Sequence, residues 1–140
     1  MMRTLIVTVM AAVLLLGAGT QLVQADALND YRKANGAKAL GYSKELERAA
    51  LAHAQDMAKN GFRSHTGSDG SDVGKRVRRL GYKWCQLSEN ITWGRSSYAR
   101  AIAAWDASPG HKKNMLRKKS REYGVAGVDG IWVMVLARRC

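Results

Sequence analysis

Signature motifs of two hydrolase classes are missing from this sequence. No HExxH helix supplies a pair of zinc-binding histidines, which argues against a metalloprotease of that type. No GxSxG turn surrounds Ser64, Ser88 or Ser108, and no ordered catalytic triad can be drawn from them, so a serine hydrolase is disfavoured. No internal repeat is visible either. Any chemistry must therefore depend on residues that the fold brings together from distant segments.

Charge is missing from one long segment near the N-terminus. Residues 4–25 carry no charged side chain, include the apolar run LIVTVMAAVLLL and close with Val23-Gln24-Ala25. This pattern predicts a signal peptide over residues 1–25, cleaved after Ala25, and one domain over residues 26–140 that is secreted or periplasmic. An uncleaved membrane anchor is the alternative, since a span needs about 20 apolar residues. No cysteine lies directly after this apolar run, which argues against lipoprotein processing.

Cysteine is scarce, with Cys85 and Cys140 as the only two. Both lie in the segment predicted to be exported, and an oxidising compartment favours their pairing. The bridge would tie the chain end to its middle and stabilise the fold by about 4 kcal/mol in the chain-entropy model. The alternative is two thiols too far apart to pair. A catalytic cysteine is disfavoured, because Cys85 has no neighbouring histidine in sequence and Cys140 is the terminal residue.

Acidic residues are outnumbered by basic ones, 11 against 23, and the formal net charge is +12. Such a charge favours anionic partners, such as a phospholipid surface or a wall polymer. Solvated faces without a partner are the alternative for the basic stretches, which are residues 75–79, 111–121 and 138–139. Nucleic acid would fit the charge, but export and the lack of interleaved aromatic residues make it an unexpected partner.

Apolar periodicity predicts several helices. Residues 27–36 form a short one that stops at Gly36, and a stronger one runs from a cap at Ser43 to Gly61. Further helices are expected over residues 73–82, 97–105 and 109–119, the last opened by Pro109 at a first helical position.

The end of the chain carries the clearest strand pattern. EYGVAGV and IWVMVLA flank Asp129-Gly130, a dipeptide suited to a tight hairpin, and QLSENITW is compatible with another strand. The last strand is apolar on both of its faces, so it should lie inside a sheet that is covered on both sides. We therefore predict an α/β fold built as a three-layer α-β-α sandwich.

Six segments resemble, in order, the CAP superfamily of cysteine-rich secretory proteins, venom antigens and plant pathogenesis-related proteins. They cover nearly all of the predicted mature chain and are most similar to the short bacterial branch of the superfamily. The segments are LERAALAHAQDMAKNG, FRSHTGSDGSDVGKRVRRLGY, SENITWG, AIAAWDASPGHKKNML, REYGVAGV and IWVMVLA. The resemblance implies an α-β-α sandwich with a central, mostly antiparallel sheet.

The resemblance also implies a central cleft with two histidines and acidic residues that can hold a divalent metal, commonly zinc. By motif the histidines correspond to His65 and His111, and the acidic residue to Glu89. Many eukaryotic members carry another glutamate where this chain has Ser108, so one ligand of their pattern is missing. In the bacterial branch Glu122 resembles a local substitute.

The same residues allow several kinds of chemistry. Two imidazoles and a carboxylate are a plausible Zn²⁺ set, with His65 and His111 as the metal ligands. A peptidase would use zinc-activated water near Glu89, and a glycosidase would pair Glu89 with Glu122. Alternatively, His65, Glu89, His111 and Glu122 form a hydrogen-bonded cluster that only joins loops. His53 lies on an apolar helix face and is interpreted as a core histidine.

From these observations we expect a monomeric binding domain. Its ligand would be an envelope component, a lipid or another anionic molecule, contacted at the cleft or at a membrane surface. Two other classes stay open: a zinc-dependent hydrolase acting on peptides or glycans, and a non-catalytic structural or toxin-like domain.

Overall fold

A computed structural model describes residues 19–140, and residues 1–18 of the predicted leader lie outside it. The first helix, α1 (Gly19–Ala34), contains the predicted cleavage point after Ala25 and ends just before Gly36, as expected. No helix within residues 19–140 is both long enough and apolar enough to cross a membrane.

The sheet has four strands in the order β1-β3-β4-β2. β3 (Glu122–Val128) and β4 (Ile131–Arg139) form the predicted antiparallel hairpin. Asp129 and Gly130 both have positive φ, 50° and 76°, which a two-residue type I′ turn requires. β2 (Trp84–Thr92) pairs antiparallel with the other side of β4. The sheet is therefore mostly antiparallel, with β2 as one of its edges.

One parallel strand was not predicted. β1 (Gly41–Tyr42) pairs with the start of β3 and is only two residues long. A strand of two residues is too short to show an alternating pattern in the sequence. It is recognised only from its pairing with β3 in the structure.

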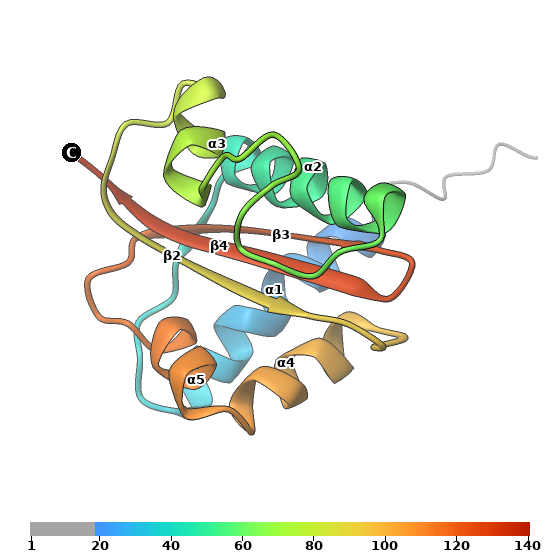
Figure 1. The fold of residues 1–140 in the computed structure, drawn as a ribbon. Helices are drawn as coiled ribbons and strands as arrows, with labels where there is room; N and C mark the ends of the chain where they lie inside the picture. The colour runs from blue at the N-terminus through green and yellow to red at the C-terminus, as the bar shows by residue number, and fades with distance from the viewer. Residues whose placement is uncertain (1–18) are drawn as a thin grey trace, which may run out of the picture.

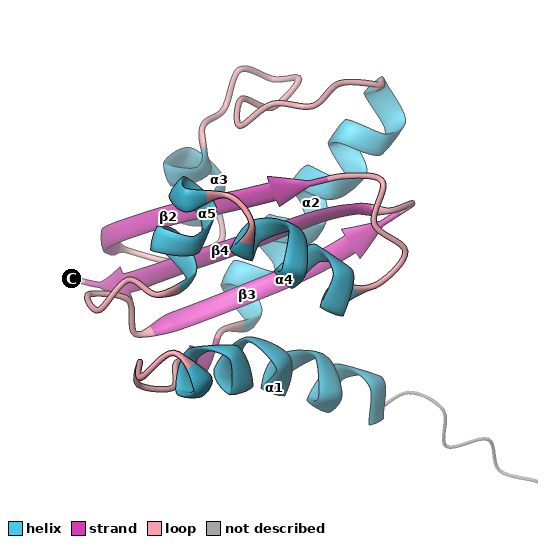
Figure 2. Cartoon of the chain, turned by 90° about the horizontal axis from the view of Figure 1, so that it is seen from below, coloured by secondary structure: helices cyan, strands magenta, loops and turns pink. Residues whose placement is uncertain are grey.

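Helices cover both faces of the sheet (Figure 1). On one face lie α2 (Lys44–Asn60), which is capped by Ser43 and ended by Gly61 as predicted, and α3 (Val73–Arg79), capped by Asp72. On the other face lie α1, α4 (Tyr98–Asp106) and α5 (Pro109–Met115). The predicted three-layer α-β-α sandwich is confirmed, and Figure 2 shows α4 and α5 lying across the sheet.

The last strand supplies both halves of the core. Val133 and Val135 pack toward α2 and α3, whereas Met134 and Leu136 pack toward α1, α4 and α5, and all four are fully buried. The apolar character of both faces of β4 follows from this position, because helices remove each face from water.

The predicted disulfide is present. Cys85 at the start of β2 is bonded to Cys140, directly after β4. The bridge closes the edge of the sheet at the end where the chain terminates.

Candidate functional site: two histidines at the sheet edge

Glu89 is the central residue of the candidate site. It lies in β2 with its side chain on the α2 and α3 face, where it is 2 % exposed. His65 Nδ1 donates to Glu89 Oε1 at 2.7 Å, and Arg76 Nη2 donates to Glu89 Oε2 at 2.7 Å. Both carboxylate oxygens are thus engaged by charge-assisted hydrogen bonds. Glu89 fixes the orientation of the His65 ring and compensates the buried charge of Arg76.

Arg76 was not singled out from the sequence. Its run, residues 75–79, was read as a solvated or anion-binding face, but Arg76 is 8 % exposed. Its Nη1 donates to the backbone carbonyls of His65 and Ser71, so it also anchors the loop that carries His65. The helical spacing contained the signal: Arg76 lies on the same stripe as Val73 and Val77.

His111 reaches the same strand from the opposite layer. It lies in α5, and its backbone carbonyl accepts a hydrogen bond from Asn90 Nδ2 at 3.0 Å. Asn90 Oδ1 in turn accepts from Asn114 Nδ2 at 2.9 Å. Glu89 and Asn90 are consecutive in β2, so their side chains point to opposite faces of the sheet. The edge strand thereby holds one histidine segment on each side.

The protonation of the two histidines differs. The hydrogen bond that His65 donates to Glu89 raises the pKa of His65, whereas burial and the charge of His65 lower the pKa of His111. The His65 side chain is 62 % exposed, so its free Nε2 edge is open to a ligand.

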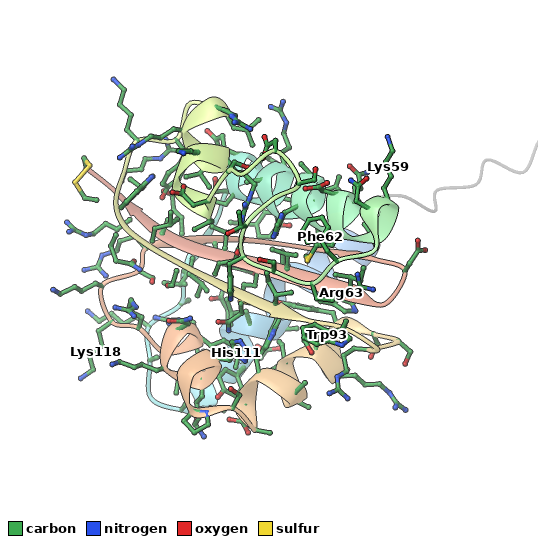
Figure 3. The ribbon with its side chains drawn as sticks, viewed as in Figure 1. Lys59, Phe62, Arg63, Trp93, His111 and Lys118 are labelled. Atoms are coloured by element: carbon green, nitrogen blue, oxygen red, sulfur yellow. A yellow bond between two sulfur atoms is a disulfide. The ribbon has the colours of Figure 1, made fainter. Side chains whose placement is uncertain are left out.

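A cavity of about 340 Å³ adjoins His111. Its wall includes Arg95 and Trp93, whose side chain is 54 % exposed. Figure 3 shows Trp93 and His111 on the same side of the molecule, next to β2. Trp93 thus lies on the wall of this cavity and is not part of the core.

Glu122 lies apart from the two histidines. Its carboxylate accepts hydrogen bonds from Tyr82 Oη at 2.6 Å and from Arg139 Nε at 3.2 Å. It belongs to β3, and β4 lies between β3 and the strand of Glu89. Two strand spacings separate the two glutamates by about 10 Å across the sheet. The structure therefore pairs the His65 ring with Glu89, joins the His111 backbone to the adjacent Asn90, and pairs Glu122 with Tyr82 and Arg139 instead.

His53 behaves as the sequence indicated. It is 1 % exposed, and its Nε2 is 2.8 Å from the Ser64 carbonyl oxygen. Burial lowers its pKa. This core histidine joins α2 to the loop that carries His65.

Two imidazoles are the donors that this site offers to a metal. Glu89 has both oxygens occupied, and no three His, Cys, Asp or Glu side chains gather as a ligand set among the described residues. The donor set fits zinc in part: His65 donates one ring nitrogen to a carboxylate, which is the usual arrangement of a metal-binding histidine. Two further positions would be left to water or to a ligand.

The fold and the site define a class of protein, a three-layer α-β-α domain with two histidines at the edge of its sheet. A family model described as the cysteine-rich secretory protein family, CAP, matches residues 25–130, and the chain belongs to this family. Protein YkwD of Bacillus subtilis (strain 168) is 28% identical over 106 residues, which cover 74% of this chain and 41% of that protein.

Solved structures agree with this assignment. An extracellular protein containing an SCP domain from Bacillus anthracis str. Ames superposes with a TM-score of 0.80 at 25% identity, over 84% of this chain and 40% of that one. An outer surface protein from Borrelia burgdorferi has a TM-score of 0.75 at 21% identity, over 86% of this chain and 92% of that one. This chain thus spans about two fifths of the length of YkwD and of the B. anthracis protein.

Proposed function

We propose that this chain is an exported binding domain for an anionic component of the cell envelope, which His65 and His111 contact at the edge of β2. The double engagement of Glu89 is the observation that carries the proposal. A carboxylate held by both His65 and Arg76 positions its neighbours and is not free to react. What the site presents outward is the oriented and exposed imidazole edge of His65.

Three further features support a binding role. The net charge of +12 favours anionic partners, and the cavity beside His111 is lined by a cation, Arg95, and by the exposed Trp93. The similar proteins include one named as extracellular and one named as an outer surface protein. The predicted leader would export this chain to the same kind of location.

Zn²⁺ is the cofactor we propose for the cleft. Donation of the Nδ1 proton to Glu89 leaves Nε2 of a neutral His65 ring with its lone pair free, and His111 would supply the second nitrogen. When bound, zinc would supply a fixed positive charge that could take an oxygen of the ligand into an open coordination position.

A zinc-dependent hydrolase is the second candidate, favoured by the short His65–Glu89 hydrogen bond. It is less well supported, because a hydrolase needs a carboxylate that can accept a proton from water near the metal, and Glu89 is engaged twice. The glycosidase form needs two carboxyl groups that face one substrate, whereas Glu89 is bonded to His65 and Arg76 and Glu122 is bonded to Tyr82 and Arg139.

Zinc titration by calorimetry tests the proposal. The wild-type domain should bind Zn²⁺ with about micromolar affinity or tighter, and the His65→Ala/His111→Ala variant should lose this binding while it stays folded. Ser108→Ala is the matched control, because Ser108 lines the same cavity but its side chain makes no capping hydrogen bond. This control should bind zinc like the wild type.

Sedimentation with vesicles of phosphatidylglycerol and phosphatidylcholine then tests the envelope ligand. Binding that weakens with added salt and is reduced in the histidine variant would support the proposal. Unchanged vesicle binding in the histidine variant, together with no zinc binding in the wild type, would contradict the role of the two histidines.

A further inference from the structure

Arg32 is a buried cation without a carboxylate partner in the described part of the chain. It lies in α1, is 1 % exposed and donates three hydrogen bonds, all to backbone carbonyls. Nε reaches the Lys38 carbonyl at 2.7 Å, and Nη1 reaches the Met115 carbonyl at 2.6 Å. Carbonyl dipoles at the end of α5 offset part of the burial cost, but they supply no full negative charge.

Arg32 is one of the residues that line a cavity of about 740 Å³. The cavity lies between the loop that follows α1 and the loop that follows α5, which lie at the same end of the molecule in Figure 2. Its volume is typical of a site for a small organic ligand. Part of the wall is apolar, from Ala37, Leu40 and Leu116.

The charged residues on this wall are all basic. Besides Arg32 they are Lys38, Lys118 and Arg121, and no acidic residue is found among the described residues that line the cavity. Lys38 and Lys118 are exposed at its mouth, and Figure 3 shows Lys118 reaching outward beyond α5. Arg32 and Arg121 both line the cavity, and burial together with the charge of Arg121 lowers the pKa of Arg32. Four cations surround a space that no side-chain anion enters.

We propose that this cavity binds a phosphate ester, with the phosphate between Arg32, Lys118 and Arg121 and the organic part against the apolar wall. A phosphate dianion or diester would provide the negative charge that Arg32 lacks, and guanidinium and ammonium groups together are the usual protein donors to phosphate. The cavity is formed by other residues than the histidine cleft, so the inference does not depend on the function proposed for His65 and His111.

NMR titration of the folded, ¹⁵N-labelled domain with glycerol 3-phosphate tests the inference. Saturable shifts are expected in the amides of residues 36–40 and 116–121, and glycerol without phosphate should cause none. The Lys38→Gln/Lys118→Gln variant should bind glycerol 3-phosphate about tenfold more weakly or worse. Both side chains are exposed, so this variant should fold like the wild type.

A second double variant controls for net charge. Lys59→Gln/Lys75→Gln removes two cations from exposed lysines of α2 and α3, on the opposite helical layer, and should keep wild-type affinity. Figure 3 shows Lys59 and Lys118 at opposite ends of the molecule. Equal weakening in both double variants, or no saturable shift around the cavity, would overturn the inference.

Vesicles of phosphatidylglycerol in phosphatidylcholine distinguish the source of the phosphate. Sedimentation that depends on Lys38 and Lys118 would identify a lipid headgroup. Binding of glycerol 3-phosphate alone, without such sedimentation, would identify a soluble ester. In either case zinc binding should be unchanged in the Lys38→Gln/Lys118→Gln variant, so a failure here is distinct from a failure of the histidine site.

Discussion

Glu89 and Asn90 are neighbours in β2, yet they hold histidine segments on opposite faces of the sheet. Glu89 bonds the His65 ring on the α2 and α3 face, and Asn90 bonds the His111 backbone on the α5 face. The alternation of side chains along a strand thus joins two histidine-bearing segments to one edge strand from opposite faces of the sheet. The Glu89 side chain is buried, so its replacement should affect folding as well as binding.

Glu89→Gln should destabilise the domain by about 3 kcal/mol or more, because it leaves the buried charge of Arg76 uncompensated. Urea unfolding at neutral pH, followed by tryptophan fluorescence, measures the change. Lys112→Gln is the control: it breaks an ion pair with Asp106 in which both side chains are about half exposed, and it should cost less than about 1 kcal/mol. Equal losses in the two variants would show that the Glu89 cluster is not a buried ion pair.

Much of the fold could be predicted because its elements carry local signals. The Ser43 and Gly61 ends of α2 are a cap and a left-handed stop, and Asp129-Gly130 between two apolar runs leaves little choice but a hairpin. The covered sheet followed from the two apolar faces of β4. These signals depend on residues close in sequence, which is why they could be read without the structure.

The site could be predicted only in part, because its contacts cross long distances in the sequence. Motif resemblance indicated His65, Glu89 and His111, and the structure shows a hydrogen bond between the first two and joins the His111 backbone to Asn90. Resemblance also indicated Glu122. The hydrogen bonds of Glu122 with Tyr82 and Arg139 could not be predicted, because both partners are distant from it in the sequence. Arg76 was missed because the residues of a basic run are usually solvated. The burial of Arg76 depends on the carboxylate of Glu89, which lies 13 residues away in the sequence.

Breaking the Cys85–Cys140 disulfide should lower the free energy of unfolding by about 2 to 5 kcal/mol, since the bridge closes a long loop in the unfolded chain. The Cys85→Ser/Cys140→Ser variant in a denaturant titration measures the loss. The oxidised wild type and the same protein held under reductant provide the comparison. If reduction lowers stability and the serine variant does not, the bridge is not the source of the effect.

Gly124→Ala should destabilise the fold severely. A Cβ at this position of β3 would overlap the backbone of Leu46 and Glu47 in α2, so the helix would have to move off the sheet. A loss of about 3 kcal/mol or failure to fold is expected, measured by denaturant unfolding and circular dichroism. Gly110→Ala is the matched control: a Cβ there meets no atom within 4 Å, and it should be neutral or slightly stabilising in α5.

The pKa values of the two histidines of the site should be shifted in opposite directions from the ordinary value of histidine. The Glu89 hydrogen bond raises the pKa of His65, while burial and the charge of His65 lower the pKa of His111. Ring resonances followed by NMR across the pH range should therefore show His111 losing its proton first as the pH rises. Glu89→Gln should lower the midpoint of His65, and a His65 midpoint that does not move would contradict this assignment.

The raised pKa of His65 also predicts how the stability of the domain changes with pH. A histidine that binds its proton more tightly in the folded state stabilises that state most below its unfolded pKa of about 6.5, and this contribution is lost as the pH rises through the folded pKa. The stability difference between the wild type and His65→Ala should thus be larger at about pH 5.5 than at about pH 9. The pKa of His111 is lowered, so protonation of this ring at acid pH opposes folding. The stability difference between the wild type and His111→Ala should therefore be smaller at about pH 5.5 than at about pH 9. Chemical unfolding of both variants at the two pH values measures both signs, and a pH dependence of the same sign in both variants would contradict the opposite shifts of the two pKa values.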